Sequence, residues 1–234
     1  MKVLECENLC LGYEGMTVVE NASFSVEEGD YICILGRNGA GKSTFVKGLL
    51  GLIPATSGKV TYEKGMKSKI GYVPQFMVLQ KDFPATVHEV VMSGFTGSLG
   101  RKLFFSKAQN EKVKEILEKL NLSEYDKASF SSLSVGQKQR ILLARAVCAD
   151  SKVLFLDEPA SGLDPAASAE FYNIISDLNS NEGVTVIMIS HDINGALRNG
   201  KKILHIDKEI EFFGSTKEYL KTNSYRRLTG GDLP

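Results

Sequence analysis

The stretch GRNGAGKS, residues 36–43, has the residue types and spacing of a loop that binds phosphate groups. It matches the pattern G-x-x-x-x-G-K-[ST], with a predicted strand before it and a predicted helix after it. Glycines let the backbone wrap closely around a phosphate, and the helix start adds N–H donors and a positive dipole. Lys42 would reach the outer phosphates, and the Ser43 hydroxyl would bind Mg²⁺. The residues predicted to hold the phosphates are Gly36, Asn38, Gly39, Gly41, Lys42, Ser43 and Thr44.

Two adjacent acids end the apolar run VLFLDE. Because successive side chains of a strand point in opposite directions, Asp157 and Glu158 can have different roles. Asp157 fits the coordination shell of Mg²⁺, and Glu158 fits the base that orients and deprotonates an attacking water. His191 ends the next apolar run, GVTVIMISH, and is predicted to contact the terminal phosphate. Gly36, Asp157 and His191 all follow predicted buried strands, where ligands collect in α/β sheets.

The stretch SSLSVGQKQRILLARA, residues 131–146, is predicted to change from a loop into a helix. Ser134 and Gln137 have the spacing of a capping box, which places Val135 at the first helical position. A capped helix start presents free backbone N–H groups and suits an anion. Nothing nearby supplies a base, a nucleophile or a metal cluster, so these residues alone do not say what the helix start faces.

The elements that must position these residues follow an α/β pattern. The runs YICIL, KIGYVPQ, KVLFLDEP and GVTVIMISH predict strands, and the last two are typical of a buried parallel sheet. Residues 3–28 predict short strands with turns at residues 14–15 and 28–30. KILHIDKEIEFFG predicts a hairpin that turns near residues 207–208, and a short helix with a capping box at residues 215–218 follows.

A helical insertion is predicted between Thr86 and about Arg140. Within it, Ser106 and Gln109 have capping-box spacing. The apolar residues that follow share one helix face and are Val113, Ile116, Leu117 and Leu120.

The bulk composition is that of a soluble globular protein of 234 residues, with 43% hydrophobic and 24% charged residues. Lys plus Arg equals Asp plus Glu at 28 each, which weakens any hypothesis of broad nucleic-acid binding. No run is long and apolar enough to span a bilayer, and the first ten residues carry acids where a signal peptide needs an apolar core. We therefore expect a cytosolic chain unless another protein recruits it.

The four cysteines are expected to be reduced. Cys6 and Cys10 lie on one predicted strand, which would separate their Cα atoms by roughly 13 Å, too far for a disulfide. His88 and His205 lack partners at the spacing of metal ligands and are expected at the surface.

With these motifs in the same chain, the sequence resembles an ATP-binding cassette (ABC) ATPase over nearly its whole length. GRNGAGKST is similar to the family's Walker A motif, and VLFLDE is similar to its Walker B motif. Gln75, in YVPQ, resembles the Q-loop glutamine, which in the family touches Mg²⁺ and senses the membrane subunit. Tyr13 resembles the aromatic residue that stacks on adenine, and His191 resembles the H-loop histidine. SGLD resembles the D-loop, which here comprises Ser161, Gly162, Leu163 and Asp164.

LSVGQ resembles the family signature, usually LSGGQ, which implies that the helix start at Ser134 faces the ATP of a second subunit. In this head-to-tail dimer the residues acting on the partner's nucleotide would be Ser134, Val135, Gly136 and Gln137. Val135 replaces a glycine, but helical backbone angles are open to a β-branched residue. We therefore expect a weakened but working contact.

The resemblance also implies the domain organisation and the chemistry. It implies one ABC ATPase domain of class α/β, a P-loop NTPase (RecA-like) core at residues 1–85 and 141–234 with an N-terminal antiparallel β subdomain. A helical signature subdomain would be inserted at residues 86–140. ATP and Mg²⁺ would be the cofactors, with hydrolysis coupled to transmembrane transport. The implied catalytic residues are Glu158, His191 and Lys42, the implied Mg²⁺ ligands are Ser43, Gln75 and Asp157, and Tyr13 and Gln75 would also contact ATP.

DFPATVHEVVMSG followed by SKAQNEKVKEILEKLNL is similar to the zinc and manganese branch of importer subunits, to which iron-chelate importers are close. The resemblance implies uptake of a metal ion by a peripheral subunit on the cytoplasmic side of the cell membrane. The implied partners are a second copy of the chain, integral membrane permease subunits and, indirectly, a periplasmic or surface solute-binding protein, with no nucleic acid. The sequence departs from this branch at VGQ and at SGLD, where a valine is expected before the aspartate.

Other functions share parts of this pattern. A subunit for another cargo or for an exporter would carry the same motifs. A P-loop metabolic kinase would use the same phosphate loop, but it does not need Gln75, the signature and His191 in this order. Cassette ATPases of DNA repair carry long coiled-coil or zinc insertions, and none is seen here.

A further hypothesis concerns the phenylalanines that follow Gln75. An exposed subset could form a groove for a helix of the membrane subunit, whereas the alternative is that all are buried. The residues concerned are Phe76, Phe83, Phe95, Phe104 and Phe105.

Overall fold

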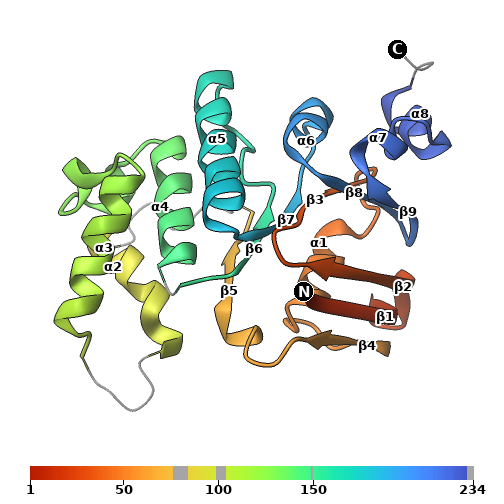
Figure 1. Cartoon of the computed structure of the whole chain (residues 1–234), viewed down its shortest axis with the longest axis horizontal. Helices are drawn as coiled ribbons and strands as arrows, with labels where there is room; N and C mark the ends of the chain where they lie inside the picture. Colours follow the sequence, from red (N-terminus) through yellow and green to blue (C-terminus); the bar gives the residue numbers. More distant parts are fainter. Residues whose placement is uncertain (76–83, 99–103, 149, 231–234) are drawn as a thin grey trace.

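A central six-stranded sheet forms the core of this computed structural model, which describes residues 1–75, 84–98, 104–148 and 150–230. The strand order is β5-β6-β7-β3-β8-β9, and all strands run parallel except β9, which pairs antiparallel with β8. The strands are β3 (Tyr31–Leu35), β5 (Ile70–Val73), β6 (Val153–Asp157), β7 (Thr185–Ile189), β8 (Lys202–Asp207) and β9 (Glu209–Ser215). The predicted buried strands and the predicted hairpin are therefore confirmed (Figure 1).

Both faces of this sheet are covered by protein. Every residue of β3, β6 and β7 is buried. Along β3, Cys33 and Leu35 join the apolar cluster that includes α5 (Pro165–Glu182) and α6 (Ile193–Asn199). Ile32 and Ile34 join the other cluster, which includes α1 (Lys42–Leu49). Such strands must be apolar on both sides, which explains their continuous hydrophobic sequence.

A three-stranded antiparallel sheet confirms the predicted N-terminal β subdomain. It consists of β1 (Lys2–Tyr13), β2 (Met16–Glu27) and β4 (Ser57–Tyr62), in the order β2-β1-β4. The prediction of short strands is wrong, because β1 and β2 have 12 residues each and stay paired through several register shifts. Glu14 and Gly15 join them with φ values of 48° and 84°, the left-handed backbone of a type I′ turn.

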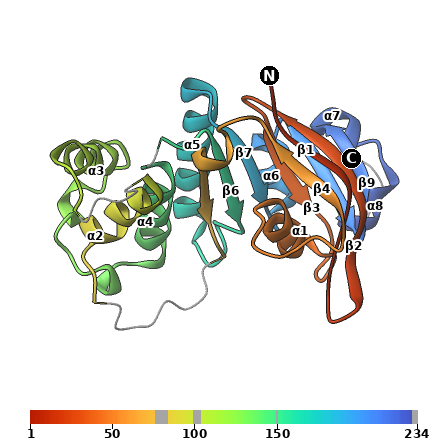
Figure 2. The same cartoon turned by 90° about the horizontal axis from the view of Figure 1, so that it is seen from below.

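The helices of the predicted insertion gather at the end of the molecule opposite the three-stranded sheet (Figure 1, Figure 2). They are α2 (Val87–Met92), α3 (Lys107–Lys119) and α4 (Val135–Val147), with the 3₁₀ turns η2 (Ser93–Ser98), η3 (Ser123–Tyr125) and η4 (Phe130–Ser132). The predicted apolar face of α3 is buried, and the capping boxes at Ser106 and Ser134 are present. Residue 140 lies inside α4, so this helix joins the helical part of the chain to the core.

Two short helices close the C-terminal part of the chain beside the β8–β9 hairpin. They are α7 (Thr216–Tyr219), which has the predicted capping box, and α8 (Asn223–Thr229). The remaining 3₁₀ turn, η1 (Lys67–Lys69), leads into β5. Across the described ranges, no helix combines the length and apolar character needed to cross a membrane.

The four cysteines are free thiols, as expected. Cys6 and Cys10 lie on the same strand, β1. Burial raises the pKa of Cys6, Cys33 and Cys148 to about 12 each, so these thiols stay protonated at neutral pH. Protonated, enclosed thiols are poor nucleophiles, which fits a structural role.

His205 is buried, so the expectation that it lies at the surface is wrong. Only 3% of the residue is exposed, because β8 lies between β3 and β9 and contacts α7. Its Nδ1 atom lies 2.7 Å from Tyr219 Oη, and its Nε2 atom lies 3.6 Å from a carboxylate oxygen of Glu211. The His88 side chain is also partly enclosed, with 24% exposure and a 2.8 Å contact to Asp126. Both histidines therefore have local partners that the sequence spacing does not reveal.

The enclosed imidazole of His205 predicts a pH-dependent stability. Burial lowers the pKa of His205 below its ordinary value, with Arg227 and Lys42 acting in the same direction and Glu211 and Asp207 opposing it. The unfolded chain therefore takes up the proton more readily. The contribution of neutral His205 to the free energy of unfolding should be fully present above pH ~6.5. It should be lost as the pH drops from there through the lowered pKa.

Urea unfolding of the wild type and of His205→Asn, over roughly pH 5 to 8, checks this expectation. Between neutral and acidic pH, the free energy of unfolding should decrease less in the variant than in the wild type, whatever the stability of the variant at neutral pH. Parallel pH profiles for the two proteins would contradict it.

Candidate active site

Four loops that carry predicted site residues meet at one edge of the central sheet. They follow β5, β6, β7 and β3, which are neighbours and run parallel, so their C-terminal ends lie side by side. One cleft at this edge is lined by residues from all four loops and from β2. Its lining residues are Val18, Asn38, Gly39, Gly41, Lys42, Ser43, Thr44, Gln75, Glu158 and His191.

The loop between β3 and α1 requires glycine at two positions. Gly36 has a φ of 152°, and a Cβ atom there would lie 2.2 Å from the carbonyl oxygen of Ile206. Gly41 is the N-cap of α1 with a φ of 93°, and a Cβ atom there would lie 3.1 Å from Val18. Within the described part of the chain, no side chain caps this helix start. Its first backbone N–H groups are therefore suited to a phosphate.

Lys42 is folded back over the loop that precedes it. The residue is 6% exposed, and its Nζ atom donates to the carbonyl oxygens of Gly36 at 2.9 Å and Arg37 at 2.8 Å. Burial lowers the pKa of Lys42, while the carboxylates of Glu158 and Asp157 oppose this shift. Phosphate oxygens that enter the cleft would stabilise the protonated amine, because they would compensate for its lost hydration.

Ser43 and Asp157 offer oxygen ligands that fit Mg²⁺. The Ser43 hydroxyl donates to Asp157 Oδ1 at 3.2 Å, and Asp157 is 2% exposed. Burial raises the pKa of Asp157 and the hydrogen bond from Ser43 opposes it, so nearby positive charge would stabilise the ionised form. Among the described residues no cluster of three or more His, Cys, Asp or Glu could hold a metal. Mg²⁺ does not need such a cluster, because it usually binds one or two carboxylates together with substrate phosphates and water.

Glu158 is held between Gln75 and His191. The Gln75 Nε2 atom donates to Glu158 Oε2 at 2.8 Å, and His191 Nε2 lies 2.5 Å from Glu158 Oε1. The Glu158 side chain is 11% exposed and that of His191 is 46% exposed. Glu158 has a φ of 50°, a conformation that non-glycine residues rarely adopt and that clusters at functional sites. A carboxylate oriented in this way can accept a proton from a water in the cleft.

The signature residues lie in a second cleft, which shares no lining residue with the first. The Ser134 hydroxyl accepts from the Gln137 N–H at 3.2 Å, and the Gln137 side chain accepts from the Ser134 N–H at 2.9 Å. Ser161, the first residue of the predicted D-loop, instead lines a hollow beside Glu158. The second cleft is lined by Ser134, Val135, Gly136, Gln137, Arg140, Gly162, Leu163, Asp164 and Ala167.

Tyr13 is not among the residues that line the phosphate cleft. It ends β1 beside Met16, and the two residues are 47% and 75% exposed at the end of the hairpin. Val18 does line the cleft, although no signal in its strand sequence marks it. Arg140 also lines the second cleft, four residues after Gly136 on α4. This spacing places both residues on the same helix face, so the sequence alone could have indicated Arg140.

A glycine-rich loop between a strand and a helix, with a buried carboxylate and a base candidate at the same sheet edge, defines a P-loop nucleoside triphosphatase. Residues 19–161 match the family model described as ABC transporter. The chain belongs to the ABC transporter family, as an ATP-binding domain of the kind that hydrolyses ATP.

The similarity extends through nearly the whole chain. The manganese transport system ATP-binding protein MntB of Bacillus subtilis is 35% identical over 234 residues, covering 98% of this chain and 93% of the relative. The zinc import ATP-binding protein ZnuC of Ruegeria pomeroyi is 34% identical over 228 residues, covering 97% of this chain and 84% of the relative. A solved inward-facing structure described as a metal-chelate type ABC transporter is 31% identical. It has a TM-score of 0.89 and covers 98% of this chain and 90% of that chain.

Replacing Glu158 with Gln should separate ATP binding from ATP cleavage. The amide keeps the size of the side chain but cannot take the proton, and general-base catalysis is worth roughly 10²–10⁴-fold. We expect single-turnover cleavage to fall by this range while the affinity for Mg-ATP stays near that of the wild type. Glu115→Gln, on the exposed surface of α3, is the matched control and should cleave ATP normally. Wild-type turnover in Glu158→Gln would remove Glu158 as the base.

Proposed function

We propose that this chain is the ATP-hydrolysing subunit of a membrane transporter that takes up a metal ion of the zinc/manganese or iron type. The observation that carries this proposal is the likeness to manganese, zinc and metal-chelate transport proteins over 97–98% of the chain. The ion would be substrate of the assembled transporter and would be bound by other subunits. A subunit for another cargo, or for an exporter, is the alternative.

The proposed partners are a second copy of this chain, integral membrane permease subunits and, indirectly, a periplasmic or surface solute-binding protein. The chain would lie peripherally on the cytoplasmic side of the cell membrane and would bind no nucleic acid. A formal net charge of zero supports the last point, because nucleic-acid binding domains usually carry a basic excess.

Phe104 is the candidate contact for a helix of the permease. It is 84% exposed, whereas Phe105 is partly buried against the apolar core and Phe95 is buried. Phe76 and Phe83 lie outside the described residues. Among the described members of this set, Phe104 alone therefore presents a largely exposed ring.

Mg-ATP is proposed to bind along the phosphate cleft. Ser43, Asp157 and Gln75 would hold Mg²⁺, Lys42 and His191 would contact the outer phosphates, and the exposed ring of Tyr13 would stack on the adenine. The hydrogen bond between Ser43 and Asp157 supports a shared ion, because it brings the two oxygens within 3.2 Å of each other.

The signature cleft is proposed to act on ATP held by the second copy in a head-to-tail dimer. Gly136 supports this, because nothing within the described part of its own chain requires a glycine there. Its φ is outside the left-handed region, and a Cβ atom would lie 3.5 Å from Ala167 and 3.7 Å from Leu163, ordinary contact distances. A ligand that approaches from outside would account for the missing side chain at this position.

Val135 is proposed to weaken this contact without abolishing it. The residue is 41% exposed and lines the signature cleft, so its side chain is available to a nucleotide of the second copy. Its helical backbone is compatible with a β-branched residue, and the Ser134 cap and the Gly136 N–H remain in place.

A growth experiment tests the metal cargo. In the organism that encodes it, loss of this chain should prevent growth in medium depleted by a metal chelator. Added zinc, manganese or iron should restore growth only for the ion that the transporter carries. The wild-type chain should restore growth without added metal, whereas Lys42→Ala should not. Normal growth of the deletion strain under every depletion would contradict metal uptake.

Mixing two inactive variants tests whether the signature acts on the partner's ATP. Lys42→Ala loses the phosphate contact, and Gly136→Asp places a carboxylate against a phosphate, where like charges repel. In a mixed head-to-tail dimer one site combines both defects and the other is intact. We expect single-turnover ATP cleavage in the mixture and none in either variant alone. If demonstrated mixed dimers cleave no more ATP than the unmixed variants, this result would contradict action of the signature on the partner's ATP.

A further inference from the structure

The turn between β8 and β9 packs directly against the phosphate loop. The carbonyl oxygen of Ile206 approaches Gly36 so closely that a Cβ atom on that glycine would lie 2.2 Å away. The N–H of Lys208 donates to the carbonyl oxygen of Ala40 at 3.4 Å, a long hydrogen bond. Gly36 therefore contacts the end of β8, and Ala40 contacts the turn residue that follows it.

His205 immediately precedes Ile206 at this contact. It pairs with Leu35, the last residue of β3 before Gly36. The pairing of β8 with β9 shifts register between His205 and Ile206, so the strand ladder is irregular where the Ile206 carbonyl meets the loop. A side-chain anchor matters most at such a point, because the ladder fixes the backbone less completely.

The imidazole of His205 supplies an anchor to the C-terminal helices. Its Nδ1 atom lies 2.7 Å from the hydroxyl of Tyr219, a fully buried residue of α7. Burial raises the pKa of Tyr219, so its hydroxyl keeps its proton and can donate to Nδ1. With Tyr219 as the donor, the ring proton would be on Nε2, which lies 3.6 Å from a carboxylate oxygen of Glu211.

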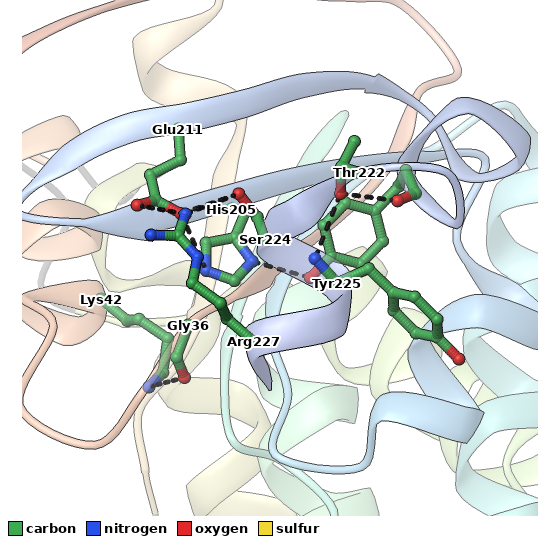
Figure 3. A network of polar contacts seen from close by, with 9 residues as sticks. Gly36, Lys42, His205, Glu211, Thr222, Ser224, Tyr225 and Arg227 are labelled. Carbon is green, nitrogen blue, oxygen red and sulfur yellow. Dashed lines mark hydrogen bonds and ion pairs between the residues drawn. The ribbon is translucent and has the colours of Figure 1, made fainter. Parts of the chain in front are cut away.

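Glu211 extends this network to α8. Its carboxylate accepts from Ser224 Oγ at 2.8 Å and from Arg227 Nη2 at 2.9 and 2.8 Å. Figure 3 shows these side chains around His205, in the region of the molecule that also contains Gly36. Leu228 of α8 lines a cleft together with Gly36, so the C-terminal helix also borders the phosphate loop directly.

We propose that His205 is a positioning residue for the phosphate loop: anchored by Tyr219 and Glu211, it fixes the end of β8 against Gly36 and keeps the loop in its ATP-binding form. It acts through the Ile206 carbonyl and does not touch the nucleotide. The C-terminal helices α7 and α8, which carry none of the predicted nucleotide-binding residues, would thereby set the affinity for ATP. This inference rests on the ATP-binding role of the chain and is independent of the cargo.

The expected effect is on binding rather than on cleavage. If the anchor is lost, a smaller fraction of molecules holds the loop in its binding form, and the apparent dissociation constant rises in inverse proportion to that fraction. Bound ATP restores the loop, so the rate at saturating ATP stays unchanged.

Tyr219→Phe tests this most directly, because it removes one hydroxyl from a buried site. We expect KM and the directly titrated Kd for Mg-ATP to rise roughly three- to tenfold, the range for one lost buried hydrogen bond, with kcat near the wild-type value. His205→Asn places an amide oxygen near the position of Nδ1, where it can accept from Tyr219. Its affinity should therefore be closer to the wild type than that of Tyr219→Phe.

Two further variants separate positioning from general destabilisation. Arg227→Gln changes a side chain that is 64% exposed, so it leaves the buried core intact, and it should also raise Kd. Ser106→Ala removes the cap of α3 in the helical part and should lower the melting temperature without changing Kd. An unchanged Kd in both Tyr219→Phe and Arg227→Gln would overturn the proposal, and so would an equal rise in Ser106→Ala. Direct titration of the Kd for Mg-ATP requires neither hydrolysis nor transport. The test therefore remains valid if the transport proposal fails.

Discussion

The parallel pairing of β3 with β7 on one side and β8 on the other is the interaction on which the rest of the structure depends. Because the strands run in the same direction, every loop that leaves a C-terminal end emerges at the same edge of the sheet. The order β5-β6-β7-β3 therefore places Gln75, Glu158, His191 and the phosphate loop around one cleft, although they are separated by up to 155 residues, from 36 to 191, along the chain. Coverage of both sheet faces excludes water from these strands and holds the loops on a rigid base.

Enclosed charges give this cleft its chemical character. Lys42 and Asp157 are 6% and 2% exposed, and burial shifts their pKa values in opposite directions, each toward its neutral form. Lys42 has backbone carbonyls as partners, and Asp157 has the Ser43 hydroxyl, so neither has lost all of its hydrogen bonds. A ligand that brings phosphates and a cation together would supply the missing opposite charge to both groups. The same physical reason favours binding of the nucleotide with its metal over binding of either alone.

The separation of the phosphate cleft from the signature cleft has a geometric consequence for the proposed dimer. A chain with two complementary surfaces can complete both sites at once when a two-fold axis relates it to a second copy. Ser134 caps α4 and Asp164 caps α5, and these caps fix the backbone of the two walls of the signature cleft. The helical end of the molecule would then contact both the ATP of the second copy and the permease. Helix α4 joins this end to the core.

By itself, the sequence determined the α/β class, the buried strands, the capped starts of α3 and α4 and the residues of the phosphate loop. These features depend on local properties, such as backbone freedom at Gly36 and Gly41, capping-box spacing and continuous apolar runs, which neighbouring residues reveal. Tertiary structure alone decided the bonds of Glu158 to Gln75 and His191, the entry of Val18 into the cleft and the burial of His205. His205 meets Tyr219 across 14 residues and Gln75 meets Glu158 across 83, because strand order and helix docking bring them together. Such contacts leave no periodic or compositional trace near either residue, so only the folded chain could show them.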